Sequence, residues 1–102
     1  MPETRYTAEE IALWNLLTMH QNEEYHTAKG LAFTYEIRGG EMFIDRRGKS
    51  VTRATVNVAY RRAMELGEEL KGPKKLSVFG ASYIYPVFVA LGVVTPASKS
   101  LR

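Results

Sequence analysis

Apolar residues recur at helical spacing near the start of the chain, behind a polar stretch. Thr7 and Glu10 form a Thr-x-x-Glu capping box, in which the hydroxyl and the carboxylate each accept a backbone N–H. The apolar positions that follow are Ile11, Leu13, Trp14, Leu16, Leu17 and Met19. This pattern predicts a helix over residues 8–20, and the polar residues 21–30 then predict a loop.

The periodicity changes to strict alternation in residues 32–46. Phe33, Tyr35 and Ile37 alternate with polar residues, and Gly39-Gly40 supplies the positive φ that a two-residue hairpin turn requires. We therefore predict a β-hairpin in which Ile37 pairs with Met42 and Tyr35 with Ile44. Each predicted pair is apolar, so the register is consistent.

A second helix is predicted over residues 51–66, capped by Ser50 and closed by Gly67. Val56, Ala59, Ala63 and Leu66 form an apolar stripe at about 100° per residue. Another side of this helix carries a different set, which we expect to face solvent or a partner: Arg53, Asn57, Tyr60, Arg61 and Met64.

The longest uncharged run spans residues 76–97. It is long enough to cross a membrane, but Gly80, Pro86 and Gly92 divide it into pieces of core length. We therefore favour a buried core over a membrane span. Residues 76–79 are predicted to be a short extended segment, and Ser82 is predicted to cap a third helix.

These elements predict one α+β domain in the order helix, β-hairpin, helix, helix, with a buried apolar C-terminal segment. A chain of 102 residues holds one core, which we place in residues 7–94, and residues 95–102 form a polar C-terminal tail. The absence of cysteine excludes disulfides, thiolate metal sites and thiol nucleophiles. No secretory signal is visible, so we expect a cytoplasmic protein.

The net charge of +3 is unevenly distributed. Residues 1–30 carry two basic and five acidic side chains, whereas residues 46–64 carry six basic side chains and no acid. Lys71, Lys74 and Lys75 follow soon after. Such asymmetry predicts either attraction between the two parts of the chain or steering of a charged partner.

Motifs for enzyme or metal chemistry are weak. Gly48-Lys49-Ser50 resembles the end of a phosphate-binding loop, but Phe43 stands where that loop needs a glycine. The two alternatives there are an ordinary helix cap and a helix N-terminus that binds anions. His20 and His26 lack metal-ligand spacing. We expect neither catalytic residues nor a bound metal or cofactor. We therefore do not expect this protein to be an enzyme.

The basic segment 46–62 supports a nucleic-acid-binding hypothesis, because Arg and Lys contact phosphates while Asn and Arg contact base edges. With DNA as the expected partner, the candidate nucleic-acid-binding residues are Arg46, Arg47, Lys49, Ser50, Arg53, Asn57, Tyr60, Arg61, Lys74 and Lys75. On this hypothesis, Arg53→Ala and Arg61→Ala weaken binding without changing stability. The alternative is a protein-interaction module or homodimer, anchored by Tyr60, Met64 and Phe43.

Two segments carry a resemblance. They are Gly-Lys-Ser-Val-Thr-Arg-Ala-Thr-Val at 48–56 and the run from Lys71 to Val94 that contains Leu-Ser-Val-Phe-Gly-Ala-Ser-Tyr-Ile-Tyr-Pro. Together they resemble small uncharacterised bacterial proteins often found near plasmid or mobile-element genes. The resemblance covers roughly residues 27–94. It implies a bacterial cytoplasmic protein with a DNA-associated role, and it assigns no role to any residue.

Overall fold

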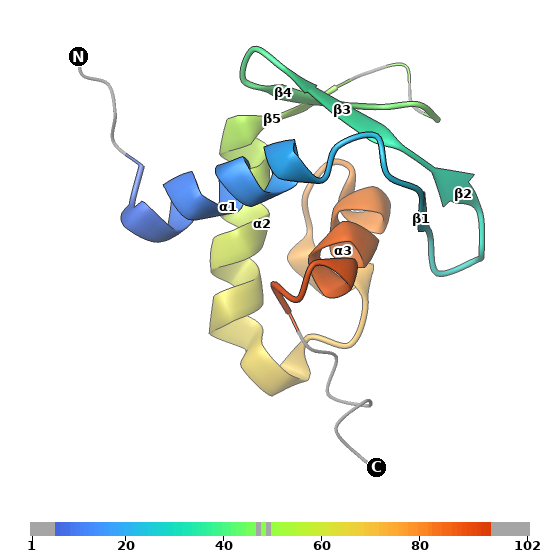
Figure 1. Cartoon of the computed structure of the whole chain (residues 1–102). Helices are drawn as coiled ribbons and strands as arrows, with labels where there is room; N and C mark the ends of the chain where they lie inside the picture. The colour runs from blue at the N-terminus through green and yellow to red at the C-terminus, as the bar shows by residue number, and fades with distance from the viewer. Residues whose placement is uncertain (1–5, 47, 49, 95–102) are drawn as a thin grey trace.

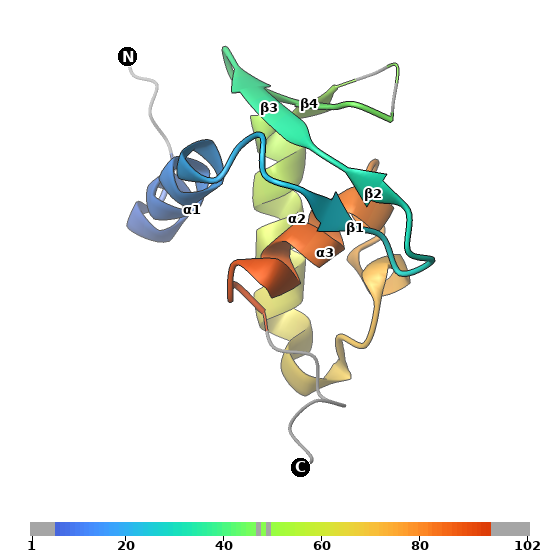
Figure 2. The same ribbon diagram turned by 45° about the vertical axis from the view of Figure 1, so that its right-hand side comes forward.

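The computed structural model describes residues 6–46, 48 and 50–94. Three α-helices, α1 (Ala8–Met19), α2 (Arg53–Leu66) and α3 (Ala81–Ala90), pack together beneath the hairpin (Figure 1). Two 3₁₀-helices, η1 (Gly67–Glu69) and η2 (Pro73–Leu76), connect α2 to α3. Helix α2 contacts both α1 and α3, and the turned view shows α3 crossing in front of it (Figure 2). The α+β class is confirmed.

Helix α1 begins as its capping box predicts. The Thr7 hydroxyl accepts from the Glu10 N–H at 3.1 Å, and the Glu10 carboxylate accepts from the Thr7 N–H at 3.1 Å. The helix ends at Met19, one residue before the predicted end, and His20 is its C-cap. Leu13, Trp14 and Leu17 face the core.

The hairpin of β3 (Tyr35–Arg38) and β4 (Glu41–Ile44) has the predicted register, with Ile37 opposite Met42 and Tyr35 opposite Ile44. Gly39 has φ +58°, which the tight turn requires. The alternating segment breaks at Thr34, so Phe33 belongs to β2 (Ala32–Phe33). That strand pairs with β1 (Tyr25–His26), which lies inside the predicted loop 21–30.

The start of α2 differs from the prediction. Residues 51–52 form a strand, β5 (Val51–Thr52), which pairs with β4, and the helix begins at Arg53. Thr52, not Ser50, is the N-cap, and its hydroxyl accepts from the Thr55 N–H at 3.2 Å. The Ser50 hydroxyl instead donates to the Glu41 carboxylate. The predicted cap at Ser50 was therefore wrong, because strand pairing holds the two residues after it extended.

Residues 76–94 supply the predicted buried segment. The extended segment predicted over 76–79 was wrong, because Leu76 ends the 3₁₀-helix η2, Ser77 has a left-handed backbone (φ +52°) and a turn follows. Helix α3 begins at Ala81 after Gly80, so Ser82 lies within its first turn and does not cap it. The largest fully buried side chains come from several elements: Leu17, Phe33, Tyr35, Met42, Val51, Val56, Leu76, Ile84, Val87 and Phe88. None of the helices in the described ranges combines the length and hydropathy needed to cross a bilayer.

Candidate functional site

Helix α1 packs on the side of α2 that was predicted to meet a partner. The Arg53 guanidinium carbon lies 4.1 Å from the centroid of the Tyr6 ring and 5.3 Å from that of Trp14. Both distances are within the range of a cation–π contact. The Nε atom of Arg53 is buried and has no hydrogen-bond partner among the described residues. Arg53 therefore contributes to the α1–α2 contact.

Asn57 lies one turn further along α2 and is only 2% exposed. The expectation that it faces solvent was wrong, because α1 packs against α2 on that side. Its Oδ1 atom has no hydrogen-bond partner among the described residues. In this conformation the Asn57 amide is not presented to the edge of a base.

Arg61 pairs with the buried carboxylate of α1. Its Nη1 lies 2.5 Å from Oε2 of Glu10, whose side chain is 5% exposed, whereas that of Arg61 is 56% exposed. The backbone hydrogen bond from Thr7 lowers the pKa of Glu10, and the Arg61 and Arg53 guanidinium groups lower it further against the opposing effect of burial. The acidic start and the basic middle of the chain thus attract each other within the molecule.

The remaining basic candidates are spread over other elements. Arg46 donates from Nε to the Ala32 carbonyl at 2.5 Å, and Lys74 and Lys75 are exposed on η2. Arg47 and Lys49 lie outside the described residues. Arg62, which belongs to the same basic run, donates to the carbonyls of Leu76 and Ser77 at 2.8 and 2.7 Å. Of the described basic candidates, Arg53 and Arg61 lie on α2, whereas Arg46, Lys74 and Lys75 lie on other parts of the chain.

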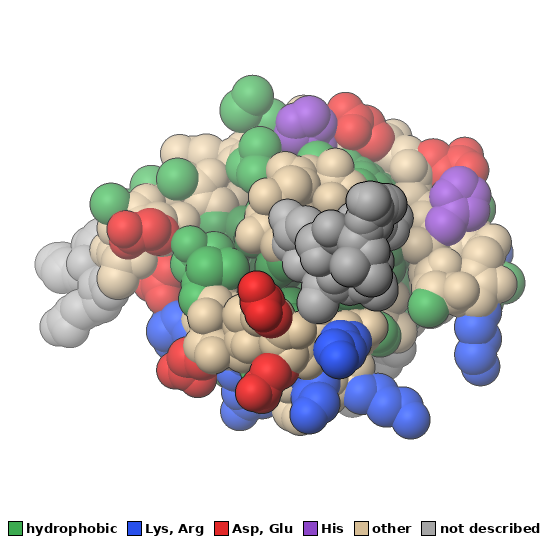
Figure 3. All heavy atoms as spheres, turned by 90° about the horizontal axis from the view of Figure 1, so that it is seen from below, with side chains coloured by type: hydrophobic (Ala, Val, Ile, Leu, Met, Phe, Trp, Pro, Cys, Tyr) green, Lys and Arg blue, Asp and Glu red, His purple; other side chains and the backbone are tan. Residues whose placement is uncertain are grey.

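Tyr60 and Met64 line an apolar surface between α1 and the C-terminal residues. A depression of about 250 Å³ at Tyr60 and a second of about 220 Å³ at Met64 share one lining residue, Val93. We call this surface the α1–α2 groove and define it by Ala12, Leu13, Leu16, Tyr60, Met64 and Val93. The charged residues among the described lining are Glu9 and Glu68. Figure 3 shows hydrophobic side chains reaching the surface beside acidic ones.

Phe43, the third predicted interface anchor, does not line this groove. It lies on β4, where the Arg38 guanidinium carbon is 4.1 Å from its ring centroid. The structure therefore brings together two of the three predicted anchors. Met64 is 47% exposed and Tyr60 is partly buried, so the groove has both an open and a packed part.

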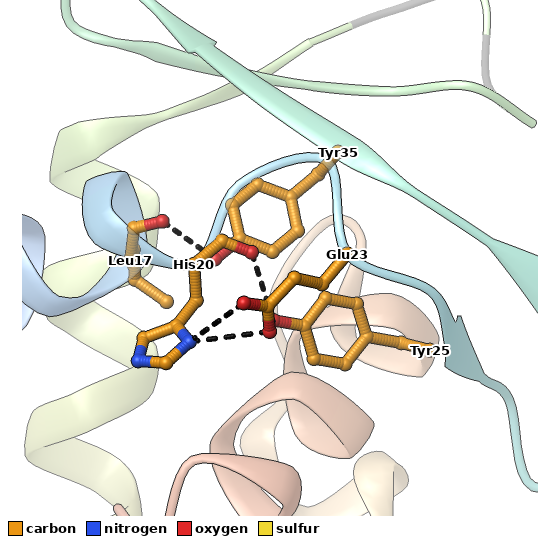
Figure 4. Close-up of polar contacts among 5 residues, drawn as sticks. All are labelled: Leu17, His20, Glu23, Tyr25 and Tyr35. Carbon is orange, nitrogen blue, oxygen red and sulfur yellow. Dashed lines mark hydrogen bonds and ion pairs between the residues drawn. The ribbon is translucent and has the colours of Figure 1, made fainter.

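Two tyrosines hold the C-terminal end of α1 (Figure 4). The hydroxyl of Tyr35 donates to the Leu17 carbonyl at 2.6 Å, and that of Tyr25 donates to the His20 carbonyl at 3.0 Å. Nδ1 of His20 lies 3.1 Å from both carboxylate oxygens of Glu23. Burial raises the pKa of both tyrosines, so their hydroxyls stay neutral donors. The two tyrosine hydroxyls therefore satisfy backbone carbonyls at the end of α1. Neither tyrosine is an ionised nucleophile.

Sequence reasoning missed the second role of Glu10 and the role of Trp14. Glu10 was assigned to the capping box alone and Trp14 to the core, although both also contact arginines of α2. The signal present in the sequence was the opposite charge of residues 1–30 and residues 46–64, which predicted attraction without pairing particular residues. Nothing in the chain indicates which two helices meet.

In comparisons with protein-family models, curated proteins and solved structures, nothing matches this chain. Within the part of the chain that the structure describes, no group of three or more His, Cys, Asp or Glu side chains is placed to hold a metal ion. The geometry of the α1–α2 groove is therefore the main basis for a functional proposal.

Proposed function

We propose that this domain is a protein-interaction module whose α1–α2 groove binds an amphipathic helix with apolar residues on one face and Lys or Arg at its borders. The observation that carries the proposal is a solvent-accessible apolar groove with a carboxylate in each of its two parts, Glu9 and Glu68. In helix-in-groove binding the bound helix inserts apolar anchors from successive turns, and the apolar surface lined by Tyr60 and Met64 is where they would pack.

The chemistry of the groove selects the partner. Ala12, Leu16 and Val93 offer apolar contact area, which favours burial of Leu, Ile or Met side chains. The two carboxylates attract cations, and no Lys or Arg is among the described residues that line the groove. A partner segment with acidic borders would be repelled at both positions.

Nucleic-acid binding, through the exposed Lys74 and Lys75 together with the 46–50 turn, is the competing hypothesis. Three of its helix residues are engaged with α1 instead. Arg53 stacks on Tyr6 and Trp14, Asn57 is buried, and Arg61 pairs with Glu10. Contacting a phosphate with Arg61 would cost its ion pair, and Glu10 would then be left buried without its cation.

The test is a nuclear magnetic resonance titration with a synthetic 18-residue helical peptide. Its leucines occupy one face, and its borders carry lysine in one version and glutamate in the other. We expect the lysine version to shift the signals of Ala12, Leu16, Tyr60 and Val93 and to bind at least fivefold more tightly. Equal binding of the two versions, or shifts elsewhere, contradicts the proposal.

Met64→Glu supplies the matched variant, and Met19→Glu supplies its control. Both methionines are exposed helix residues, at 47% and 74%, but Met19 does not line the groove. We expect Met64→Glu to change peptide affinity at least threefold and Met19→Glu to leave it unchanged. Salt-dependent binding of random duplex DNA that shifts Lys74 and Lys75 would favour the nucleic-acid hypothesis instead.

Sedimentation at several concentrations tests a second copy of the chain as the occupant. We expect a monomer, because the carboxylates in the groove call for a basic partner segment. Self-association that Met64→Glu abolishes and Met19→Glu preserves would show that a second copy occupies the groove and would overturn the proposed partner chemistry.

A further inference from the structure

A pocket of about 360 Å³ lies between β1 and α3. We call it the β1–α3 pocket; among its lining residues are Tyr25 and His26 from β1, Pro73 from η2, and Tyr85, Pro86 and Val89 from α3. Its volume is within the range of small-molecule sites, which are concave and mostly apolar. Neither the α1–α2 groove nor the basic segment contributes a residue to it.

Two prolines and a stacked tyrosine line the pocket. Pro86 lies inside α3, and Pro73 begins η2. The ring of Tyr25 is fixed from behind, because it stacks on Tyr35 with ring centroids 5.5 Å apart. The Tyr25 hydroxyl donates to the end of α1, so this tyrosine contributes its ring to the pocket wall.

Two polar groups at the pocket are open to a ligand. The hydroxyl of Tyr85 forms no hydrogen bond with another described residue, and burial raises the pKa of this tyrosine, which keeps the hydroxyl neutral. The carboxylate of Glu24 lies at the rim, where its Oε2 is 3.2 Å from Nε2 of His26. The Glu24 side chain is 64% exposed, so this contact leaves much of the carboxylate accessible.

The charges of the pocket indicate the sign of its ligand. Glu24 is the one acidic residue among the described lining, and neither Lys nor Arg is among them. Tyrosine ring faces attract cations as well, so the walls and the rim favour the same charge. An anionic ligand would meet the Glu24 carboxylate, and the one basic side chain of the described lining, His26, is already paired with that carboxylate.

We propose that the β1–α3 pocket binds a small organic cation with an apolar body, of the arylalkylamine class. The apolar part packs between Tyr85, Pro86 and Val89, and the ammonium group lies at the Glu24 carboxylate. The Tyr85 hydroxyl serves ligands that carry an additional hydrogen-bonding group. This site is separate from the α1–α2 groove, so the domain has two surfaces for two kinds of ligand.

Three probes of nearly equal size test the charge: 2-phenylethylamine, 2-phenylethanol and 3-phenylpropanoate. We expect the amine to bind with a Kd of about 1 mM, which is typical of the affinity of so small a ligand. The alcohol is expected to bind more weakly and the carboxylate weakest. Nuclear magnetic resonance titration measures each affinity from the signals of Ala28 and Ala90, which line the pocket. Equal binding of all three, or binding of none, overturns the proposal.

Glu24→Gln should reduce the amine affinity three- to tenfold and leave the alcohol affinity unchanged. Glu36→Gln is the matched control, since Glu36 is also exposed but does not line the pocket.

Ala90→Trp places an indole at the exposed end of α3 beside the pocket and should abolish binding of both ligands. Loss of amine binding in Glu36→Gln, or none in Glu24→Gln, contradicts the assignment. Met64→Glu should leave amine binding unchanged, which separates this proposal from the proposed function.

Discussion

Helix α2 meets its two neighbouring helices by different means. Against α1 it uses charged and aromatic side chains, because Arg61 pairs with Glu10 and Arg53 stacks on Trp14. Towards η2 and α3, its buried Val56 and Ala63 belong to the apolar core. The start of α3 packs closely on β5, the strand that leads into α2, because a Cβ at Gly80 would lie 2.7 Å from Cγ2 of Val51. The contact with α1 therefore depends on charge, and the packing around α3 depends on shape.

This difference shows why a basic helix face is ambiguous. A row of Arg residues on an amphipathic helix predicts nucleic-acid binding when its surroundings are solvent. The same row has a structural role when an acidic helix packs over it. The two contacts should differ in their response to an added side chain, to the loss of a cation and to pH.

The largest effect is expected at the α3 contact. Gly80→Ala introduces both a side chain at φ +80° and a clash with Val51, so we expect a loss of roughly 2–4 kcal/mol in the free energy of unfolding. Gly30→Ala is the control, because Gly30 has φ +86° but nothing within 4 Å of its added Cβ. It should cost only about 1–2 kcal/mol, from backbone strain alone. Urea denaturation measures both, and equal losses would show that shape does not decide this contact.

An intermediate effect is expected at the α1 contact. Arg53→Ala removes the cation from between Tyr6 and Trp14 and should lower the free energy of unfolding by about 1–2 kcal/mol. This outcome differs from the nucleic-acid hypothesis, which expects the variant to be as stable as the native chain. Thermal denaturation decides between them, and Arg46→Ala, at an exposed arginine outside this contact, serves as the comparison.

The smallest effect is expected from Glu10→Gln, because glutamine retains the capping box and loses only the charge. The folded state lowers the pKa of Glu10 from 4.5, so the folded chain binds this proton less tightly than the unfolded chain. The stabilisation by its charge is therefore fully present above pH 4.5 and is lost as the pH falls further. The native chain and the variant should differ in stability at pH 7 and converge as the pH falls below 4.5. A difference that does not change with pH would show that the Glu10 charge has no part in it.

Local patterns predicted the three α-helices and the hairpin, whereas the environment of each face depended on distant contacts. The hairpin register followed from the alternation around Gly39, and the α2 faces followed from helical spacing. That α1 would cover Arg53 and Asn57 depends on partners far away along the chain, and no local pattern carries that information. The two-residue strand β5 escaped prediction because a segment so short has no periodicity of its own.

The two ends of α1 are held by contacts of very different sequence separation. The hydrogen bond from Tyr35 to Leu17 spans 18 residues, whereas the contact between Glu10 and Arg61 spans 51. Closing the shorter loop costs less chain entropy, so the C-terminal end of α1 is the first that can be anchored during folding. During synthesis on the ribosome, the hairpin emerges before α2 and can hold that end. The acidic N-terminal end of α1 remains without its cation until Arg61 has been made.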